Sequence, residues 1–278
     1  MAKKQLSDAE IKAQILARTQ QENTTVESQF PTEIVPLPSK GLCYPTDNPL
    51  SVGHIEMKYM TAREEDILTN NNLLKQGKAL DRLYEALVIG NGEGQAVKIS
   101  DMIVGDRSAM MLAARVLGYG QEYEINITHP DTDKPFAHTV NLNDLKPRDF
   151  DESIFHNENR FEIKLPVSKK TVTFKLQTAK EQFTINKEVE RQEKVGISKP
   201  ITTLLKNVII DIDGNDDKKY IHKFIDNQLL ARDSLFLRNY MIDISPDYDL
   251  TVRVDRPDVG YSEDVHLPIG VDFFWPRS

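Results

Sequence analysis

The sequence predicts an α+β protein with a discontinuous helical core, an inserted antiparallel β module and a C-terminal β-hairpin. Apolar residues recur at helical spacing in two separate regions, roughly residues 61–118 and 198–243. Such stripes are typical of helices that face a core. Between and after these regions, apolar and polar residues alternate over short segments, as in half-buried strands. We therefore expect the two helical regions to share a core to which the β modules are attached.

Five segments are expected along the chain. An N-terminal helix and an extended proline-rich arm cover residues 1–50, and the first half of the helical core covers residues 51–120. The antiparallel β module spans residues 121–177, and the second half of the helical core spans residues 178–245. A β-hairpin and an aromatic tail occupy residues 246–278.

The first segment combines a short helix with a stiff arm. A capping-box pattern precedes a helix in which Ile11 and Ile15 lie one turn apart. Five of the 14 prolines fall between Phe30 and Pro49. Each proline fixes its own φ and favours an extended residue before it. We expect this arm to lie either on the protein's own body or on a neighbouring subunit.

The first half of the helical core begins with a strand at residues 54–59, where polar and apolar residues alternate. Thr61 and Glu64 form a capping box that opens a helix through Leu68. A stronger helix follows, with a wide apolar stripe of Leu80, Leu83, Tyr84, Leu87 and Val88, and it ends at the glycines from Gly90 onward. Asp106 is expected to cap the next helix, which carries Met110, Met111, Ala114 and Leu117 and stops at Gly118.

Four alternating segments between residues 121 and 177 indicate the β module. They contain Tyr123, Ile125 and Ile127; His138, Val140 and Leu142; Phe161, Ile163 and Leu165; and Val172, Phe174 and Leu176. Their connections are too short for parallel crossovers, so the strands are expected to be antiparallel.

Helical patterns resume at Thr178. The stretch from Lys187 to Lys194 is charged on all sides and indicates a solvated helix. Ser198, with Pro200 in the first turn, starts a helix with the stripe Leu204, Leu205, Val208 and Ile209. After a turn at Asp213–Asn215, one helix carries Tyr220, Ile221, Phe224 and Ile225. Asp233 is expected to cap a second one, with Leu237, Tyr240 and Met241 facing inward. Alternation from Tyr248 to Val254, followed by the turn "RPDVG", indicates the final hairpin.

The composition excludes several classes of protein. The net charge of −8, from 43 acidic and 35 basic residues, argues against a general nucleic-acid binder, which would present a basic face. A single cysteine, Cys43, cannot form an intrachain disulfide. No apolar stretch resembles a secretory signal or reaches the ~20 residues of a membrane helix. We expect a soluble species made in the cytoplasm, with no membrane insertion.

No metal site or cofactor is expected. The acidic loop Asp211–Asp217 has the wrong spacing for a calcium-binding EF-hand, because Gly214 is its fourth residue and His222 its twelfth. A turn that leads into a helix N-terminus is the preferred interpretation. His129 and His138 flank one hairpin loop, but a third metal ligand is missing.

No catalytic pattern is recognisable either. A Gly-x-Ser-x-Gly elbow is absent from the sequence, and the glycines of "GNGEGQ" follow a predicted helix instead of opening one, unlike a phosphate-binding loop. Cys43 has no neighbouring histidine to activate it. We therefore expect no enzymatic activity.

Binding features are more prominent. The arm and the tail both combine apolar side chains with a proline-stiffened backbone, which loses little entropy on docking. The chain's one tryptophan, Trp275, is the fourth residue from its end. The interface candidates are Pro36, Leu37, Pro38, Tyr44, Phe273, Phe274, Trp275 and Pro276. In the alternative interpretation, which stays open, both segments pack on the protein's own core.

Three groups of segments together cover most of residues 36 to 276. The first comprises "LPSKGLCYP", "MTAREEDIL" and "LDRLYEALV". The second comprises "LGYGQEYEINITHPDT" and "FEIKLPVSKKTVTFKLQTAKEQ". The third runs from "DGNDDKKYIHKFIDNQLLARDSLFLRNYMIDISPDYDLTV" to "LPIGVDFFWP". In this order, a set far more specific than any one motif, the segments resemble a baseplate protein family of T-even-type contractile-tailed bacteriophages.

The resemblance implies a structural role in the baseplate hub, in a hetero-oligomeric assembly with other baseplate and tail proteins. It places the protein in the virion tail after assembly in the host cytoplasm. Relatives often carry Cys-x-x-Cys knuckles, which look like zinc ribbons, where this chain has "THPDTDKP" and "VDRPDVGY". Without those cysteines, the turns at Pro130–Pro135 and Pro257–Gly260 must close the hairpins without metal.

Two other functions remain open at this stage. The first is a tail or hub assembly chaperone that leaves before the virion is complete, which the same motifs allow. The second is an enzyme with an unfamiliar site around His129, His138 and the acidic loops, which rests only on the presence of titratable groups.

Overall fold

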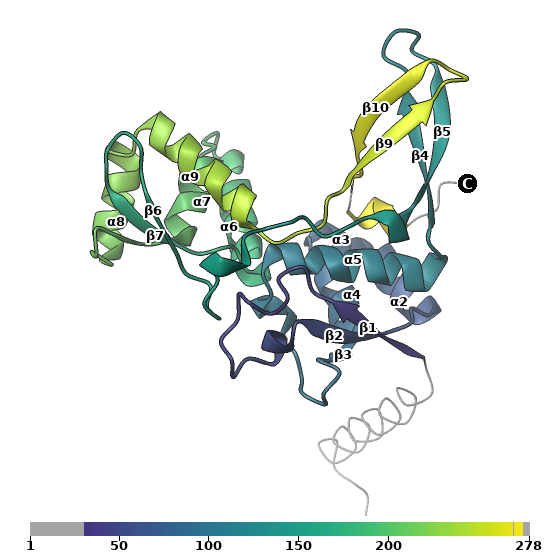
Figure 1. Ribbon diagram of the computed structural model, residues 1–278, viewed down its shortest axis with the longest axis horizontal. Helices are drawn as coiled ribbons and strands as arrows, with labels where there is room; N and C mark the ends of the chain where they lie inside the picture. The colour runs from purple at the N-terminus through teal and green to yellow at the C-terminus, as the bar shows by residue number, and fades with distance from the viewer. Residues whose placement is uncertain (1–30, 269, 275–278) are drawn as a thin grey trace, which may run out of the picture.

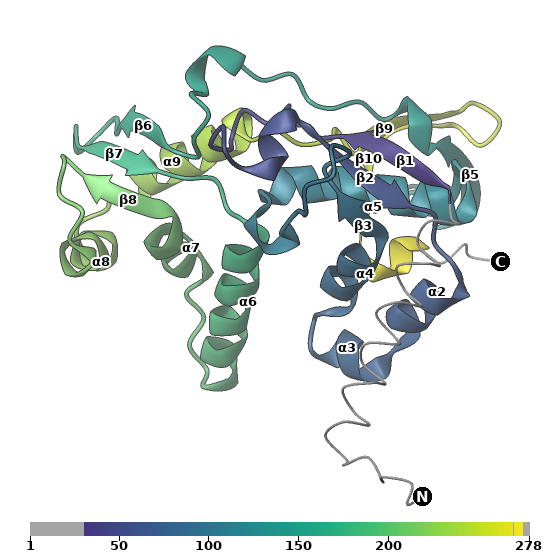
Figure 2. The same cartoon turned by 90° about the horizontal axis from the view of Figure 1, so that it is seen from below.

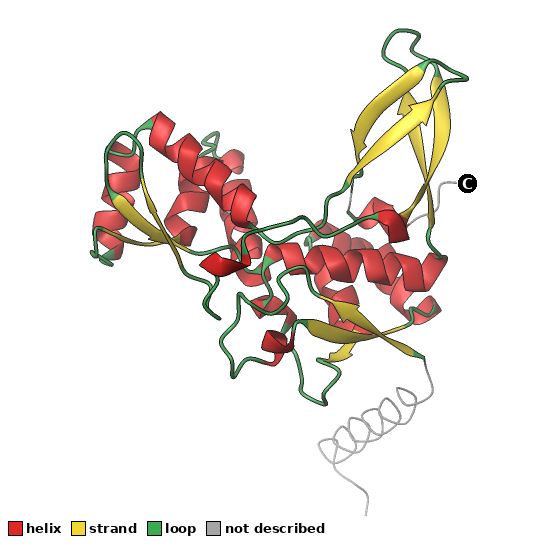
Figure 3. Cartoon of the chain, in the orientation of Figure 1, coloured by secondary structure: helices red, strands yellow, loops and turns green. Residues whose placement is uncertain are grey.

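The computed structural model describes residues 31–268 and 270–274. The expected N-terminal helix with Ile11 and Ile15 lies outside these residues. The α+β class is confirmed: helices and small antiparallel sheets alternate along the chain (Figures 1 and 3). Short 3-10 helices lie between the main elements: η1 (Pro49–Val52), η2 (Ile99–Asp101), η3 (Leu142–Asp144), η4 (Glu152–Ile154) and η5 (Val271–Phe274).

The first part of the protein is built on a three-stranded antiparallel sheet. Its strands, in spatial order, are β1 (Thr32–Pro36), β2 (His54–Lys58) and β3 (Val88–Gly90). Val35 pairs with Ile55, and Met57 pairs with Val88, so the alternating residues expected for residues 54–59 point into the core. Its helices are α2 (Ala62–Thr69), α3 (Asn71–Lys75), α4 (Ala79–Leu87) and α5 (Val104–Tyr119).

Two helix boundaries of this part differ from the prediction. Helix α4 ends at Leu87, because Val88 has an extended backbone and starts β3. Helix α5 continues through Gly118 and ends before Gly120, whose φ is +84°. Gly118 makes room for a neighbour: a Cβ there would lie 2.4 Å from Cε of Met60. A glycine inside a helix therefore reflects close packing here, and not a helix end.

The second part contains another three-stranded antiparallel sheet, in the order β6 (Phe161–Lys164), β7 (Thr171–Phe174) and β8 (Ile209–Ile212). The helices around it are α6 (Ala179–Lys194), α7 (Pro200–Val208), α8 (Lys218–Asn227) and α9 (Ala231–Ile244). Figure 2 shows α6 and α7 extending away from this sheet. Ile209 was expected in the stripe of α7, but it starts a strand, in keeping with the β-branched sequence Ile-Ile-Asp-Ile.

The four strands expected between residues 121 and 177 do not form one sheet. Strands β4 (Glu122–Thr128) and β5 (Pro135–Asn141) pair only with each other, whereas β6 pairs with β7 and β7 pairs with the distant β8. The final hairpin is formed as expected, by β9 (Thr251–Arg256) and β10 (Tyr261–His266). It lies beside the β4–β5 hairpin, and the two project together from the body (Figure 1).

Two connecting segments run side by side between the hairpins and the second part. The backbone N–H of Arg148 donates to the carbonyl of Asp247 at 2.8 Å, and that of Asp249 donates to the carbonyl of Lys146 at 2.9 Å. This ladder crosses the first turn of α5 at Gly105, where a Cβ would lie 1.7 Å from the Pro246 carbonyl oxygen. Buried residues from all parts form one continuous apolar cluster, from Val35 to Phe274.

Candidate interaction surfaces

The proline-rich arm is part of the protein's own core. Leu37, Pro38 and Tyr44 are buried, whereas Pro36 is exposed at the end of β1. After Pro38 the chain reverses through Gly41, whose φ is +81° and whose Cβ position lies 2.3 Å from the Ser51 carbonyl oxygen. No side chain fits in that space, so the turn requires glycine. In the described conformation, the three buried side chains contribute packing and offer no surface to a partner.

A buried carboxylate fixes the arm to α5. Asp106 accepts hydrogen bonds from the Ser39 N–H at 2.9 Å, the Ser39 hydroxyl at 2.7 Å and the Tyr44 hydroxyl at 2.6 Å. The Tyr44 hydroxyl accepts in turn from the Ile103 N–H at 3.0 Å. Burial raises the pKa of Asp106 to about 6, although these donors act in the opposite direction. The prediction that Asp106 caps α5 is wrong: Ile103 is the N-cap, and Asp106 is the third residue of the helix.

Cys43 lies next to this network and is almost completely buried. Burial raises the pKa of its thiol far above the usual range, and the nearby Asp106 carboxylate raises it further. A thiol held in its neutral form by these surroundings is a poor nucleophile. The arrangement therefore agrees with a packing role for Cys43.

The aromatic tail returns to the base of the first hairpin. Phe273 and Phe274 lie in η5 and have no exposed surface. The ring of Phe273 contacts that of Tyr123 in β4, with 4.8 Å between centroids. The Arg115 guanidinium also lies near the Tyr123 ring, 5.7 Å from its centroid, and donates to the carbonyls of Gly120 and Glu122. Trp275 and Pro276 lie outside the described residues.

The two hairpins are closed and joined by side chains. The His129 N–H donates to the Lys134 carbonyl at 3.0 Å, which closes the first turn. The ring of Tyr261 in the second hairpin contacts Phe136 and His129 of the first, with centroid separations of 5.0 and 5.8 Å. The expected hairpins are thus present, and these contacts join them directly.

The Arg256 guanidinium stabilises the turn of the second hairpin and also contacts the first hairpin. Arg256 donates through Nε and Nη2 to the two carboxylate oxygens of Asp258, at 2.9 and 2.7 Å. Its Nη1 donates to the Ala137 carbonyl of the neighbouring hairpin at 2.6 Å, and the group lies 5.6 Å from the centroid of Phe136. Within the described residues, no group of three or more His, Cys, Asp or Glu side chains is arranged to hold a metal ion.

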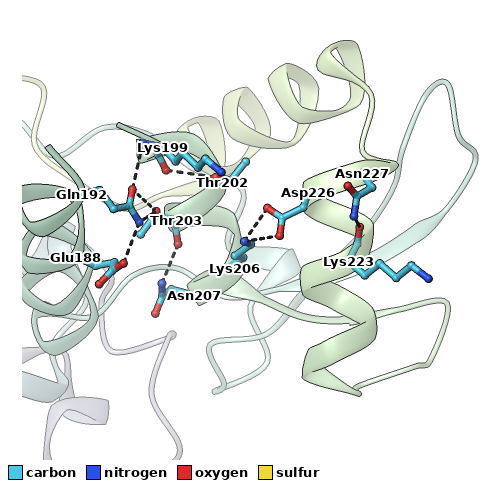
Figure 4. A network of polar contacts seen from close by, with 10 residues as sticks. All are labelled: Glu188, Gln192, Lys199, Thr202, Thr203, Lys206, Asn207, Lys223, Asp226 and Asn227. Carbon is cyan, nitrogen blue, oxygen red and sulfur yellow. Dashed lines mark hydrogen bonds and ion pairs between the residues drawn. The ribbon is translucent and has the colours of Figure 1, made fainter. Parts of the chain in front are cut away.

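A polar cleft of about 800 Å³ lies between α6, α7 and α8. Figure 4 shows Gln192 reaching from α6 to α7. Its amide nitrogen donates to Glu188 at 3.0 Å and to the Thr203 hydroxyl at 3.1 Å, and its oxygen accepts from the Lys199 N–H at 3.2 Å. These bonds connect the two helices across their loop.

The charges of the cleft are mostly matched within the protein. Lys206 of α7 pairs with Asp226 of α8 at 2.7 Å, and Lys175 pairs with Glu181. His222 also lines the cleft but is exposed on α8. The contacts of Gln192, Lys206 and Lys175 therefore form a structural network, which holds the helices around the cleft in place.

The sequence model of the T4 bacteriophage base plate protein family matches residues 37–275. The chain belongs to this family. The match begins in the arm, directly after Pro36, and ends in the tail at Trp275, so it includes most of the surfaces described above. No curated protein matches the chain, and no solved structure matches it. As a T4-type baseplate protein, the chain is a structural phage component that associates with other baseplate proteins.

In this baseplate protein, the predicted site residues do not gather in one place. Leu37, Pro38 and Tyr44 are buried beside the first turn of α5, and Phe273 and Phe274 are buried under β4. His129 and His138 lie on the β4–β5 hairpin, but His129 is buried against Tyr261. No helix of the described residues has the length and apolar character needed to cross a membrane.

Sequence reasoning missed the two carboxylates that organise this baseplate protein. Asp106 was interpreted as a cap, and so was Asp233, whose oxygens accept from the N–H groups of Val167 and Ser168 at 2.8 and 2.9 Å. Leu230, and not Asp233, is the N-cap of α9. One signal was available. In each case an apolar residue, Ile103 or Leu230, immediately precedes the helix, and the aspartate follows three positions later, inside the first turn.

Proposed function

We propose that this protein is a non-enzymatic subunit of the baseplate hub and is retained in the virion. Its membership of the T4 baseplate family over residues 37–275 supports this proposal. The groups best suited to chemistry have structural surroundings: the Cys43 thiol is buried, Lys206 is paired with Asp226, and Asp106 holds the arm. Function then resides in protein–protein contacts made in the virion tail after assembly in the host cytoplasm.

Three of the predicted interface residues remain candidates for contacts with neighbouring subunits. Pro36 is exposed at the end of the edge strand β1, beside Ile34, whose side chain is also exposed. Trp275 and Pro276 lie outside the described residues and stay predictions. The proposal assigns no nucleic acid, membrane or cofactor to these surfaces.

Quantitative mass spectrometry of gradient-purified particles and isolated baseplates tests the proposal. We expect a small, fixed number of copies relative to a known tail protein. A phage-encoded replication protein, measured in the same fractions, controls for contamination. Absence from particles, together with abundance in the infected-cell lysate, would overturn the proposal and identify a transient assembly chaperone.

A further inference from the structure

An apolar groove of about 320 Å³ lies where α7 and α9 meet the first turn of α5. Val104, Leu176, Leu204 and Met241 contribute apolar walls. Ile242 forms part of its rim and remains 58 % exposed. A large aliphatic side chain left in water beside an apolar hollow is typical of a surface that a partner covers.

Two guanidinium groups line the same groove. Arg148 donates to the Ser245 carbonyl at 3.4 Å and lies 3.8 Å from Asp247. Within the described residues, the buried Nε–H groups of both Arg148 and Arg238 have no acceptor, and Arg238 in addition has no carboxylate that pairs with it. A half-buried guanidinium without partners loses hydration and gains no hydrogen bond in return. An incoming carboxylate would supply the missing acceptors in a bidentate geometry.

The apolar surface continues from the groove along α9. Leu235, Arg238 and Ile242 are spaced i, i+3 and i+7, which places them on one face of the helix. Leu235 is 50 % exposed. The face therefore presents an aliphatic residue, a cation and a second aliphatic residue in a row. Aliphatic contacts around a desolvated arginine are characteristic of the energetic centre of protein interfaces.

From these observations we infer that the α9 groove binds a segment of another baseplate protein that carries a carboxylate between large apolar side chains. Charge complementarity selects this occupant: among the described residues, the groove has two guanidiniums in its lining and no carboxylate. The inference rests on the proposed function, because it gives the baseplate subunit a specific neighbour. The carboxylate would pair with Arg238, while the apolar side chains cover Leu235 and Ile242.

Photo-crosslinking in infected cells tests the groove. Ile242 is replaced in the full chain by p-benzoylphenylalanine, and the same replacement at the exposed Lys223 of α8 serves as the control. We expect position 242, and not position 223, to crosslink to one baseplate protein at a peptide that contains Asp or Glu. A crosslink to a second copy of this chain or to its own residues 1–30 would overturn the inference, and so would the absence of any crosslink.

Charge exchange tests the role of Arg238. Arg238→Glu should lower the copies per particle by about tenfold or more, as expected for loss of a central charged contact. Arg232→Glu makes the same change on an exposed part of the same helix and should have little effect. Changing the crosslinked carboxylate of the partner to Lys should restore incorporation of the Arg238→Glu protein.

The melting temperature of each variant separates this effect from misfolding. Equal incorporation of the Arg238→Glu and Arg232→Glu proteins, or failure of the reversed charge to restore a well-folded Arg238→Glu protein, would overturn the inference. The unaltered protein distinguishes the two proposals: if it is found in particles, such a result removes the groove but leaves the subunit function. If it is missing from particles, the proposed function itself fails.

Discussion

Asp106 and Asp233 are buried carboxylates at the same position of two different helices. Each is the third residue of its helix, α5 or α9, and each accepts hydrogen bonds from a loop more than 60 residues earlier in the chain. The helix dipole favours a negative charge at this place. In both cases a carboxylate in the first turn of a helix holds a distant loop. The pKa of Asp106 is raised and that of Asp233 is lowered, so their contributions to stability change with pH in opposite directions.

Asp106→Asn should change the pH dependence of stability. Because the folded-state pKa is raised to about 6, the folded protein binds this proton more tightly than the unfolded chain does. The stabilisation is complete below the unfolded-state pKa, near 4, and is lost as the pH rises through about 6. The total is about 3 kcal/mol by linkage. Denaturant unfolding between pH 4 and 7 should show this loss in the unaltered protein and in an exposed Asp131→Asn control, but not in Asp106→Asn.

Asp233→Ala should destabilise the protein at neutral pH, by about 2–3 kcal/mol for lost charge-assisted bonds. Burial alone would raise the pKa of Asp233, but the N–H groups of Val167 and Ser168 lower it below the usual value. This contribution is therefore present above the unfolded-state pKa and is lost as the pH falls through the folded-state pKa. Urea unfolding of Asp233→Ala at pH 7 measures the effect, and a loss below 0.5 kcal/mol, about the limit for surface changes, would contradict it.

The sequence placed an aspartate near the start of each of these helices, but it showed neither its position inside the first turn nor its partners. An aspartate near a helix start follows from composition and position alone. That Asp106 meets Ser39 and Tyr44 depends on the tertiary fold, since these residues are separated by 67 and 62 positions. The arm was predicted to be extended, but only Thr32–Pro36 forms a strand, and the turns that follow bring the arm into the protein's own core through these tertiary contacts.

At the scale of elements, local sequence patterns predicted the positions of most helices and strands. They could not predict which strands pair, because pairing depends on contacts between residues that are distant in the sequence. The capping box at Thr61 was identified correctly, and so was the start of the helix that follows Thr178, because both signals are local. The β8 strand was missed because a short apolar run after a helix fits either structure. Once β8 joins β7, the β6–β7 pair is drawn away from the β4–β5 hairpin.

Gly105→Ala should be strongly destabilising. Its Cβ would lie 1.7 Å from the backbone oxygen of Pro246, and backbone atoms cannot move aside as a flexible side chain can. We expect a loss of about 3 kcal/mol or more, at the upper end for overpacking. Gly118→Ala in the same helix is the matched control, because its neighbour is the mobile end of Met60 and alanine favours the helix by about 1 kcal/mol. Equal melting temperatures for the two variants would refute this explanation.

At the scale of the whole molecule, the segment η5 supports the two hairpins that project from the body. The paired hairpins are the most extended part of the protein (Figure 1), and their base is packed by Phe273 of η5 against Tyr123 of β4. The tail was predicted to be either an interface or part of the core. Phe273 and Phe274 belong to the core, which agrees with the general tendency of aromatic side chains to be buried.

Phe273→Ala should therefore weaken the hairpin pair in particular. Truncating a fully buried phenylalanine costs about 3–5 kcal/mol. Hydrogen exchange should show faster opening of β4, β5, β9 and β10, while β6 and β7 keep their protection. Phe183→Ala, on the partly exposed surface of α6, is a control of the same chemistry. Uniform loss of protection in all strands would argue against a local role for the tail.

The contact between Phe273 and Tyr123 also constrains the order of events during synthesis. Strands β1 to β3 and helices α2 to α5 can begin to pack as soon as residues 31–119 have left the ribosome, because the strand pairs and the contacts of α2 with α4 and of α5 with β1 lie within that stretch. The β4–β5 hairpin emerges next but must wait for more than 100 further residues before β9, β10 and η5 cover it. Its apolar face is thus exposed to aggregation or chaperones until residues 251–274 have been made. A chain that terminates before β9 keeps that face uncovered, so only a chain that includes η5 carries the packed hairpin pair into assembly.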